Sequence, residues 1–296
     1  MAGAFFRAIV FAGLVGAAAL WWITRPAPLP DGPELAQGDA EAGALVFAAA
    51  GCASCHVTPG APGTEQPVLA GGRAFETQFG TFFAPNITLD PEAGIGGWNQ
   101  AEFAHALREG VSPEGRHYYP AFPYTAYAQM TPGDVADLYA YMQHLPASME
   151  QSKPHDLPFP VSVRRTLGVW KLLGQREDFH LQGDLSPEEM RGRYLAEALG
   201  HCSECHTPRN ALGVPDRDRW LAGAPSPTGK GKIPNITPGV LDWSEADLVA
   251  YFTTGLTPDY DSAGGDMAVV VENLALLPDS DRAALAAYLL RIETVR

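Results

Sequence analysis

Cys52-Ala53-Ser54-Cys55-His56 and Cys202-Ser203-Glu204-Cys205-His206 are two copies of one pattern, and they contain all four cysteines of the 296-residue chain. The pattern C-x-x-C-H is the attachment motif of a c-type haem. Its two thiols bond to the two vinyl groups of one porphyrin, and the His that follows lies under the iron as proximal ligand. The sequence therefore predicts two covalently bound haem c groups and a chain that transfers electrons.

Two other interpretations of the cysteines are possible. A C-x-x-C pair also occurs in thiol-disulfide sites and as half of a zinc site. However, the two pairs of a four-thiolate zinc site usually stand about 15 to 20 residues apart. Here 146 residues lie between Cys55 and Cys202, and each pair is followed directly by His. The shared His favours haem attachment.

The composition excludes one class of partner. The net charge is −14, with 34 acidic and 20 basic residues, and 46% of the residues are hydrophobic. Nucleic-acid binding requires clusters of Lys and Arg, so we expect no nucleic acid. An acidic surface suits electrostatic steering toward a basic partner, although it is equally typical of a solvated surface.

The N-terminus carries an apolar stretch. Residues 8–23 follow Arg7 and contain no charge. This is either a secretion signal or a membrane helix, and its length is at the short limit for spanning a bilayer. Trp21 and Trp22 suit a bilayer interface better than a cleavage site, so we favour an uncleaved anchor within residues 1–25. Because c-type haem is attached outside the bacterial inner membrane, we expect the bulk of the chain in the periplasm.

The chain repeats itself after this stretch. Each motif follows an expected helix, and residues 85–88, Pro-Asn-Ile-Thr, match residues 234–237. Two helix starts follow at corresponding places, Asn99-x-x-Glu102 and Ser244-x-x-Asp247. Each half then ends in another expected helix, over 134–145 and 281–292. A further capping box, Ser186 to Glu189, precedes the second motif.

This layout resembles the cytochrome c subunits that accompany membrane-associated bacterial dehydrogenases, and other dihaem class I-like cytochromes c. The resemblance covers nearly everything from residue 38 onward. The three-haem dehydrogenase subunits have a third C-x-x-C-H domain, which this chain lacks. The segments that carry the resemblance are CASCH (52–56), PNIT (85–88), residues 110–142, PHDLPFP (154–160), CSECH (202–206), IPNIT (233–237) and residues 264–289.

The resemblance implies an all-α fold of two cytochrome c-like domains in tandem, preceded by one N-terminal membrane-anchor helix. We place a Pro-rich stalk at 26–37, the first domain at 38–146 and the second at 186–296. The connector, residues 147–185, contains an expected short helix in RRTLGVWKLLGQ (164–175). It is either a plain linker or a strap packed over both domains.

The motif positions make His56 and His206 the proximal iron ligands. In such domains the sixth ligand is usually a Met in the loop before the last helix. Met267 is the only Met in that loop of the second half. In the first half related sequences often have Met where this chain has Phe122, which cannot bind iron.

The sixth position of the first haem therefore has three possible states. Met130 is the only Met in this loop, and we favour it. It aligns with Leu277, however, which suggests a core residue. His117 is the second candidate, and an open iron is the third possibility.

Four polar residues near the motifs have less specific roles. Asn86 and Asn235 are expected to fasten the loop beside each haem or to form a turn. Arg73 and Arg209 are either propionate partners or surface charges.

We therefore expect a membrane-anchored periplasmic dihaem cytochrome c. It would pass single electrons from a dehydrogenase or another reduced donor to a cytochrome or a terminal oxidase, and it would not be an enzyme on its own. The alternatives are a haem enzyme resembling thiosulfate dehydrogenase or a peroxidase, acting at the first haem, and a fixed subunit of an oxidase complex.

Overall fold

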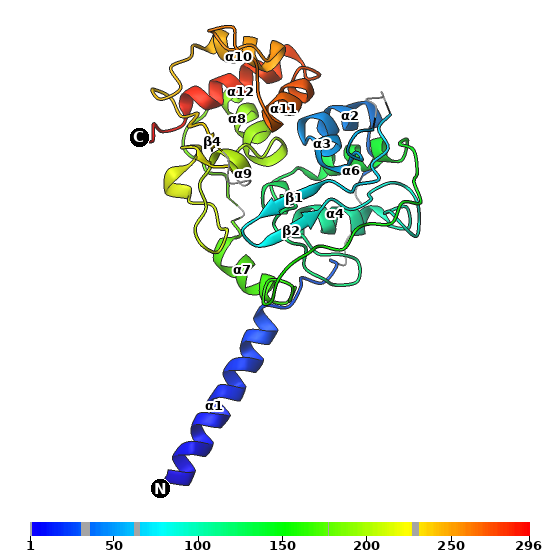
Figure 1. Cartoon of the computed structure of the whole chain (residues 1–296), viewed down its shortest axis with the longest axis vertical. Coiled ribbons are helices and arrows are strands. Elements are labelled where there is room, and N and C mark those ends of the chain that lie inside the picture. Colours follow the sequence, from blue (N-terminus) through cyan, green and yellow to red (C-terminus); the bar gives the residue numbers. More distant parts are fainter. Residues whose placement is uncertain (1, 31–35, 62–65, 177, 227–230) are drawn as a thin grey trace.

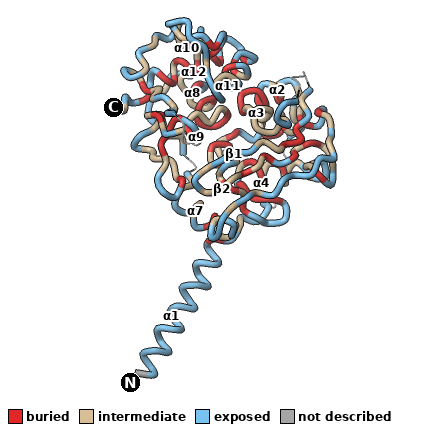
Figure 2. The backbone as a smooth tube through the Cα atoms, viewed as in Figure 1, coloured by how far each residue is buried: buried red, intermediate tan, exposed pale blue. Residues whose placement is uncertain are grey.

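A single long helix projects from a globular body in the computed structural model (Figure 1). The structure describes residues 2–30, 36–61, 66–176, 178–226 and 231–296. The projecting helix is α1 (Ala2–Ile23), and its apolar stretch, Gly3–Ile23, has a mean hydropathy of 1.9. It is exposed along its whole length (Figure 2). At about 1.5 Å per residue, its 22 residues extend about 33 Å, which is enough to cross a bilayer core.

The globular body contains two similar series of elements and one connecting helix. The first series is α2 (Ala40–Ala49), α3 (Cys52–His56), β1 (Ala74–Thr77), β2 (Gly80–Phe83), α4 (Gln100–Glu109), α5 (Tyr124–Tyr127) and α6 (Pro132–Met142). The connecting helix is α7 (Thr166–Gly174). The second series is α8 (Pro187–Tyr194), a π turn η1 (Leu195–Leu199), α9 (Ser203–His206), a 3-10 turn η2 (Arg217–Arg219), β3 (Ala224–Pro225), β4 (Lys232–Ile233), α10 (Glu245–Thr254), α11 (Asp266–Leu274) and α12 (Asp279–Arg291).

The fold is helix-rich, but the expectation of an all-α fold missed two small antiparallel hairpins. In the first, Ala74 of β1 pairs with Phe83 of β2. In the second, Ala224 of β3 pairs with Ile233 of β4. Both hairpins lie in the long loop after a motif, and their strands are too short to give a sequence period of two.

The helix starts follow the sequence prediction. Asn99 and Glu102 form a capping box at α4, and Ser244 and Asp247 form one at α10. In each box the N-cap side chain accepts from a backbone N–H, and the acidic residue accepts from the N-cap backbone. The predicted box from Ser186 to Glu189 likewise begins α8.

The first and last helices of each series pack closely through a glycine. A Cβ on Gly43 of α2 would lie 2.0 Å from the carbonyl oxygen of Asp137 in α6. A Cβ on Gly192 of α8 would lie 1.8 Å from the carbonyl oxygen of Ala284 in α12. No other residue type permits these approaches, so the two helix pairs meet in the same way.

The connector contacts both series of elements. On the first, Thr81 and Asp156 form an isolated bridge, and the Tyr119 hydroxyl donates to Val161 O at 2.9 Å. On the second, Trp170 Nε1 donates to Leu212 O at 2.9 Å, and Glu197 accepts from the backbone of residues 180 and 181. The connector therefore makes hydrogen bonds to both series of elements.

The end of α1 is docked on the body. Thr24 is only 4% exposed, and its carbonyl oxygen lies 3.1 Å from His117 Nε2. A Cβ on Gly168 of α7 would lie 2.1 Å from the same oxygen. The expected stalk begins against α4, where His105 Nε2 lies 3.0 Å from Ala27 O, and its residues 31–35 lie outside the described residues.

Candidate haem-binding sites

Each C-x-x-C-H motif lies on a single helical turn. Gly51 precedes α3 with φ 62°, which lets the chain turn sharply from α2 into the first motif. No disulfide joins any of the four cysteines. Burial is the main cause that raises the pKa of Cys52 and of Cys202 to about 12. This environment, before a haem is attached, is unlike that of the low-pKa thiolate of a disulfide oxidoreductase.

The cysteines do not converge with other ligands on a zinc ion. Among the residues that the structure describes, no group of three or more His, Cys, Asp or Glu side chains is arranged to hold a metal. Each motif thus offers two thiols and one imidazole, which is the donor set for a covalent haem.

Both motif imidazoles are oriented by a backbone carbonyl. His56 Nδ1 lies 2.9 Å from Pro85 O, and His206 Nδ1 lies 2.9 Å from Pro234 O. Since a carbonyl only accepts, each Nδ1 donates and each Nε2 keeps its lone pair. Burial lowers the pKa of both imidazoles, which favours the neutral form. A neutral imidazole with a free Nε2 is the form that binds iron, so these residues fit a haem.

In each half, one backbone hydrogen bond folds the loop after the motif back onto the His of that motif. Gly71 N donates to His56 O, and Gly223 N donates to His206 O, both at 2.7 Å. The φ values of these glycines are 77° and 81°, which favour glycine. A Cβ on Gly71 would lie 2.5 Å from Pro85 O, the carbonyl that holds His56. Sequence reasoning missed both glycines, although each follows its His at a similar interval.

The two asparagines fasten these loops to the end of each half. The Asn86 amide donates to Ser148 O and Glu150 O, both at 2.8 Å. The Asn235 amide donates to Val295 O at 2.7 Å. Each side-chain oxygen also accepts from the backbone two residues on, which makes an Asx turn. The expected fastening and the expected turn are therefore both present.

Residues of the second series of elements contact the first motif and the residues beside it. The amide of Asn273 in α11 donates to Ser54 Oγ in the first motif at 2.9 Å. Tyr127 donates to Ala50 O at 3.1 Å, and its ring lies 5.7 Å from that of His201. His201 directly precedes Cys202. The interface therefore joins the residues that flank both motifs, a proximity for which the sequence gives no signal.

The arginines near the motifs have protein partners. Arg73 donates to Ser54 O and pairs with Asp266 at 2.6 Å. Arg209 pairs with Glu204 of the second motif and donates to Gly213 O at 2.8 Å. Both guanidinium groups thus lie next to a motif and also stabilise its loop.

The expected sixth ligands differ in their surroundings. Met267 is half-buried in the first turn of α11. Met130 is 1% exposed and its N–H bonds to Tyr127 O, just as the N–H of the equally buried Leu277 bonds to Leu274 O. His117 lies against the end of α1, where its Nε2 donates to Thr24 O.

A family model described as "Cytochrome c" matches residues 40–146. The chain is 55% identical over 285 residues to a protein of Cereibacter sphaeroides named "Diheme cytochrome c-type", with 95% of this chain and 96% of that one covered.

The chain is also similar to subunits of larger complexes. It is 39% identical to the "Fructose dehydrogenase cytochrome subunit" of Gluconobacter japonicus, over 81% of this chain. It is 32% identical to the "Alcohol dehydrogenase (quinone), cytochrome c subunit" of Gluconacetobacter polyoxogenes, over 96% of this chain. The matches span only 50% and 60% of those two proteins.

Proposed function

This chain belongs to the dihaem c-type cytochromes and carries two covalently bound haem c groups, and from this premise we propose that it is a membrane-anchored periplasmic carrier of single electrons. Each haem, when bound, supplies an iron that gains or loses one electron. The protein's own residues hold the ligands, exclude water and present a docking surface.

We assign the first haem to Cys52, Cys55 and His56 and the second to Cys202, Cys205 and His206. The equal 2.9 Å contacts between each His Nδ1 and a Pro carbonyl support this assignment, because they leave both Nε2 atoms free. We assign the sixth position of the second haem to Met267, whose half-buried side chain lies in the first turn of α11, before the last helix α12.

Met130 is our candidate sixth ligand for the first haem. It is a buried thioether that lies between α5 and α6. His117, the alternative, already has its Nε2 bonded to Thr24 O.

We further propose that residues 38–146 and 186–296 form two cytochrome c domains and that residues 147–185 strap them together. The matching helix pairs through Gly43 and Gly192 support the division. The contact between Asn273 of α11 and Ser54 joins the second half to the first motif, and we propose that electrons pass between the haems across this interface.

The docking of α1 supports an uncleaved anchor. A signal peptide is removed after export and needs no packing partner in the mature protein. Here Thr24 is buried, Arg165 donates to Trp21 O, and Gly168 makes room for the end of α1.

The relatives suggest the donor. Those named above are cytochrome subunits of fructose and alcohol dehydrogenases, and another is the "Gluconate 2-dehydrogenase cytochrome c subunit" of Pantoea cypripedii. We therefore propose that a dehydrogenase reduces this protein. The acceptor would be a cytochrome or a terminal oxidase, steered by the net charge of −14 toward a basic face.

The matched pair of motifs carries this proposal, so the first experiment removes one motif at a time. Denaturing mass spectrometry should find two haem adducts on the full chain and one on each double variant, C52S/C55S and C202S/C205S. A53S, which leaves the first motif intact, is the control. Loss of both adducts from one double variant would contradict independent sites.

The second experiment tests the carrier role. The reduced full-length protein should be reoxidised rapidly by an oxidised soluble cytochrome c, with one electron leaving per haem. Steady turnover of thiosulfate or hydrogen peroxide by the isolated protein would instead favour an enzyme.

A further inference from the structure

Basic residues gather where α1 enters the body, although the chain as a whole is acidic. The twenty residues between Asp156 and Glu177 include four Lys or Arg and no Asp or Glu. Arg25 follows α1 directly. The guanidinium of Arg25 lies 4.0 Å from the Trp22 ring centroid, and that of Arg165 lies 5.0 Å from the Trp21 ring centroid. The cations thus lie next to the aromatic end of the apolar helix.

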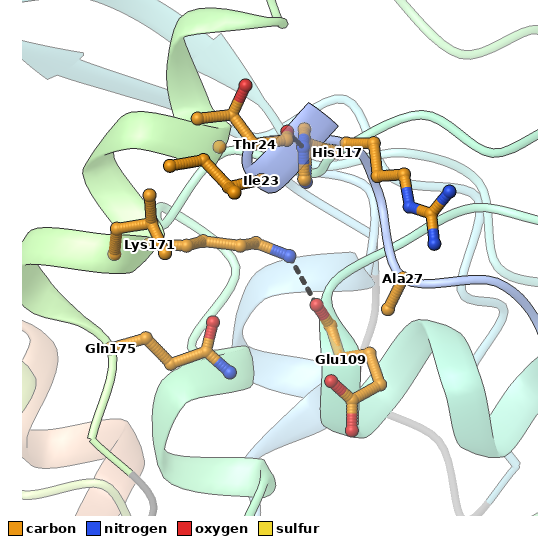
Figure 3. Close-up of a pocket in the computed structure, with 10 residues that line it drawn as sticks. Ile23, Thr24, Ala27, Glu109, His117, Lys171 and Gln175 are labelled. Atoms are coloured by element: carbon orange, nitrogen blue, oxygen red, sulfur yellow. Dashed lines mark hydrogen bonds between the residues drawn. The ribbon is translucent and has the colours of Figure 1, made fainter. Parts of the chain in front are cut away.

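The same place holds a cavity of about 350 Å³, which we call the foot pocket. Its lining includes Ile23, Arg25, Glu109, His117, Lys171 and Gln175. Figure 3 shows the Lys171 side chain reaching from α7 across to the backbone carbonyl of Glu109, with Ile23 and His117 nearby. Ile23 is the last residue of α1, so the pocket lies at the level where lipid headgroups follow the hydrocarbon core.

Lys171 has hydrogen-bonding capacity left for a ligand. Its ammonium group donates to Glu109 O and to Gly110 O, the latter at 3.0 Å, at the C-terminus of α4. It also lies 4.5 Å from the centroid of the Tyr124 ring. An ammonium group has three N–H donors, so one remains. Burial lowers the pKa of Lys171 to about 8, and a bound anion would offset that cost.

His117 lines the pocket on the side of α1. The side chain is 4% exposed, and Nε2 donates to Thr24 O, so the neutral ring carries a lone pair on Nδ1. Nδ1 is buried and has no hydrogen-bond partner among the described residues. His117 therefore fastens the end of α1 at the wall of the pocket and adds no positive charge to it.

The rim of the pocket is apolar on the side of α7. Leu172 and Leu173 are 57% and 56% exposed, and Leu172 also lines the pocket. These exposed leucines lie at a level where they can contact acyl chains, if α1 is inserted in a bilayer.

We propose that the foot pocket binds the headgroup of an anionic phospholipid, such as phosphatidylglycerol, with its phosphate at Lys171 and Arg25. This rests on the proposed insertion of α1 in the membrane. The carboxylate of Glu109 is the acidic group on the rim, and the cations Arg25, Lys171 and Arg165 outnumber it. The bound lipid would fix the body against the bilayer surface.

The experiment uses full-length protein in nanodiscs of phosphatidylcholine with a minor fraction of phosphatidylglycerol. After exchange into mild detergent, mass spectrometry counts the lipids that each protein retains. We expect phosphatidylglycerol to be retained in preference to phosphatidylcholine. K171M and R25Q should each weaken its retention about tenfold, which corresponds to about 1.4 kcal/mol.

The control is K153M, which removes one exposed positive charge away from the foot pocket and should retain the lipid as the wild type does. Inorganic phosphate added in detergent should not displace the lipid, because it lacks the acyl chains. Displacement by phosphate alone would identify a free-anion site and overturn the proposal. Three other results would overturn the proposal too. These are equal retention of both lipids, unchanged retention in K171M and R25Q, and an uncharged molecule in the pocket.

Failure of the anchor itself is recognised separately. The native protein should remain in the membrane fraction at high salt. If it is released, the anchor proposal fails. If it remains but does not select phosphatidylglycerol, only the lipid site fails.

Discussion

His56 Nδ1 lies 2.9 Å from the carbonyl oxygen of Pro85, a residue 29 positions further along the chain. The contact orients the imidazole before any partner binds on the other side. It also connects the motif to the loop that Gly71 and Asn86 hold in place. A change in that loop should therefore alter the ligand geometry without touching the motif itself.

Replacement of Met267 tests the second iron. M267A should abolish the thioether-to-iron absorption of one haem in the oxidised protein and lower the potential of that haem, because His/Met ligation raises potential. M149A is the matched control, since Met149 is 83% exposed, and its spectrum should equal that of the wild type. Unchanged spectra in M267A would rule this ligand out.

Carbon monoxide tests the first iron. If Met130 fills the sixth position, the reduced wild type should bind little carbon monoxide, and M130A should bind it at one haem. H117A should behave as the wild type in this assay, because His117 is bonded at the end of α1. Stoichiometric binding by the wild type would show an open position and support an enzyme.

The contact between Gly168 and Thr24 predicts that alanine in place of this helical glycine destabilises the protein. G168A should destabilise the protein by about 1–3 kcal/mol, because its Cβ would overlap the Thr24 carbonyl. G133A in α6 is the control, since a Cβ there meets nothing closer than 3.8 Å, and it should stabilise by up to about 1 kcal/mol. Denaturant unfolding of both variants in detergent measures the difference.

Replacing Asn86 by alanine should lower the free energy of unfolding more than replacing Asn235. N86A leaves two carbonyl oxygens, those of Ser148 and Glu150, without the amide donor, and should cost about 2–3 kcal/mol. N235A loses one such bond, to Val295 next to the C-terminus, and should cost about 1 kcal/mol. A larger loss in N235A would contradict the fastening role assigned to Asn86.

The pKa of Lys171 predicts how stability changes with pH in detergent. Burial lowers this pKa from 10.5 to about 8, so between these values the unfolded chain keeps a proton that the folded chain has lost. Stability contributed by this group therefore rises with pH across that window. Glu109 is the charged neighbour that acts on Lys171, and the imidazole of His117, whose pKa burial lowers, lies close to Lys171 and Arg165. Unfolding free energies of the wild type and K171M, measured from pH 8 to 10, should diverge; parallel curves would contradict the shift.

Local signals in the sequence were sufficient for the two motifs and for the starts of several helices, but not for the two hairpins or for α5 and α11. The capping boxes at Asn99 and Ser244 start helices where predicted, because their hydrogen bonds involve residues three positions apart. The C-x-x-C-H spacing is likewise local. The helix over 134–145 was predicted two residues late, since Thr131 caps α6 and Pro132 begins it.

Contacts between distant residues could not be predicted from the sequence. The bond between Asn273 and Ser54 joins residues 219 positions apart, and no periodicity signals it. The same holds for Gly168 against Thr24, which docks the end of α1, and for His105 against Ala27 at the start of the expected stalk. Phe122 in place of a methionine also left the sixth ligand of the first haem open, and burial of Met130 alone does not distinguish a ligand from a core residue.

The docking of Thr24 against Gly168 has a consequence for how partners would be met. A carrier on a flexible tether would take many orientations above the membrane and could meet a partner with any side. With α1 inserted and fixed to the body, this protein would turn only about the axis of that helix while it drifts in the plane. Both haems would then travel at constant heights, and a partner would exchange electrons only if its own redox centre stands at a matching level.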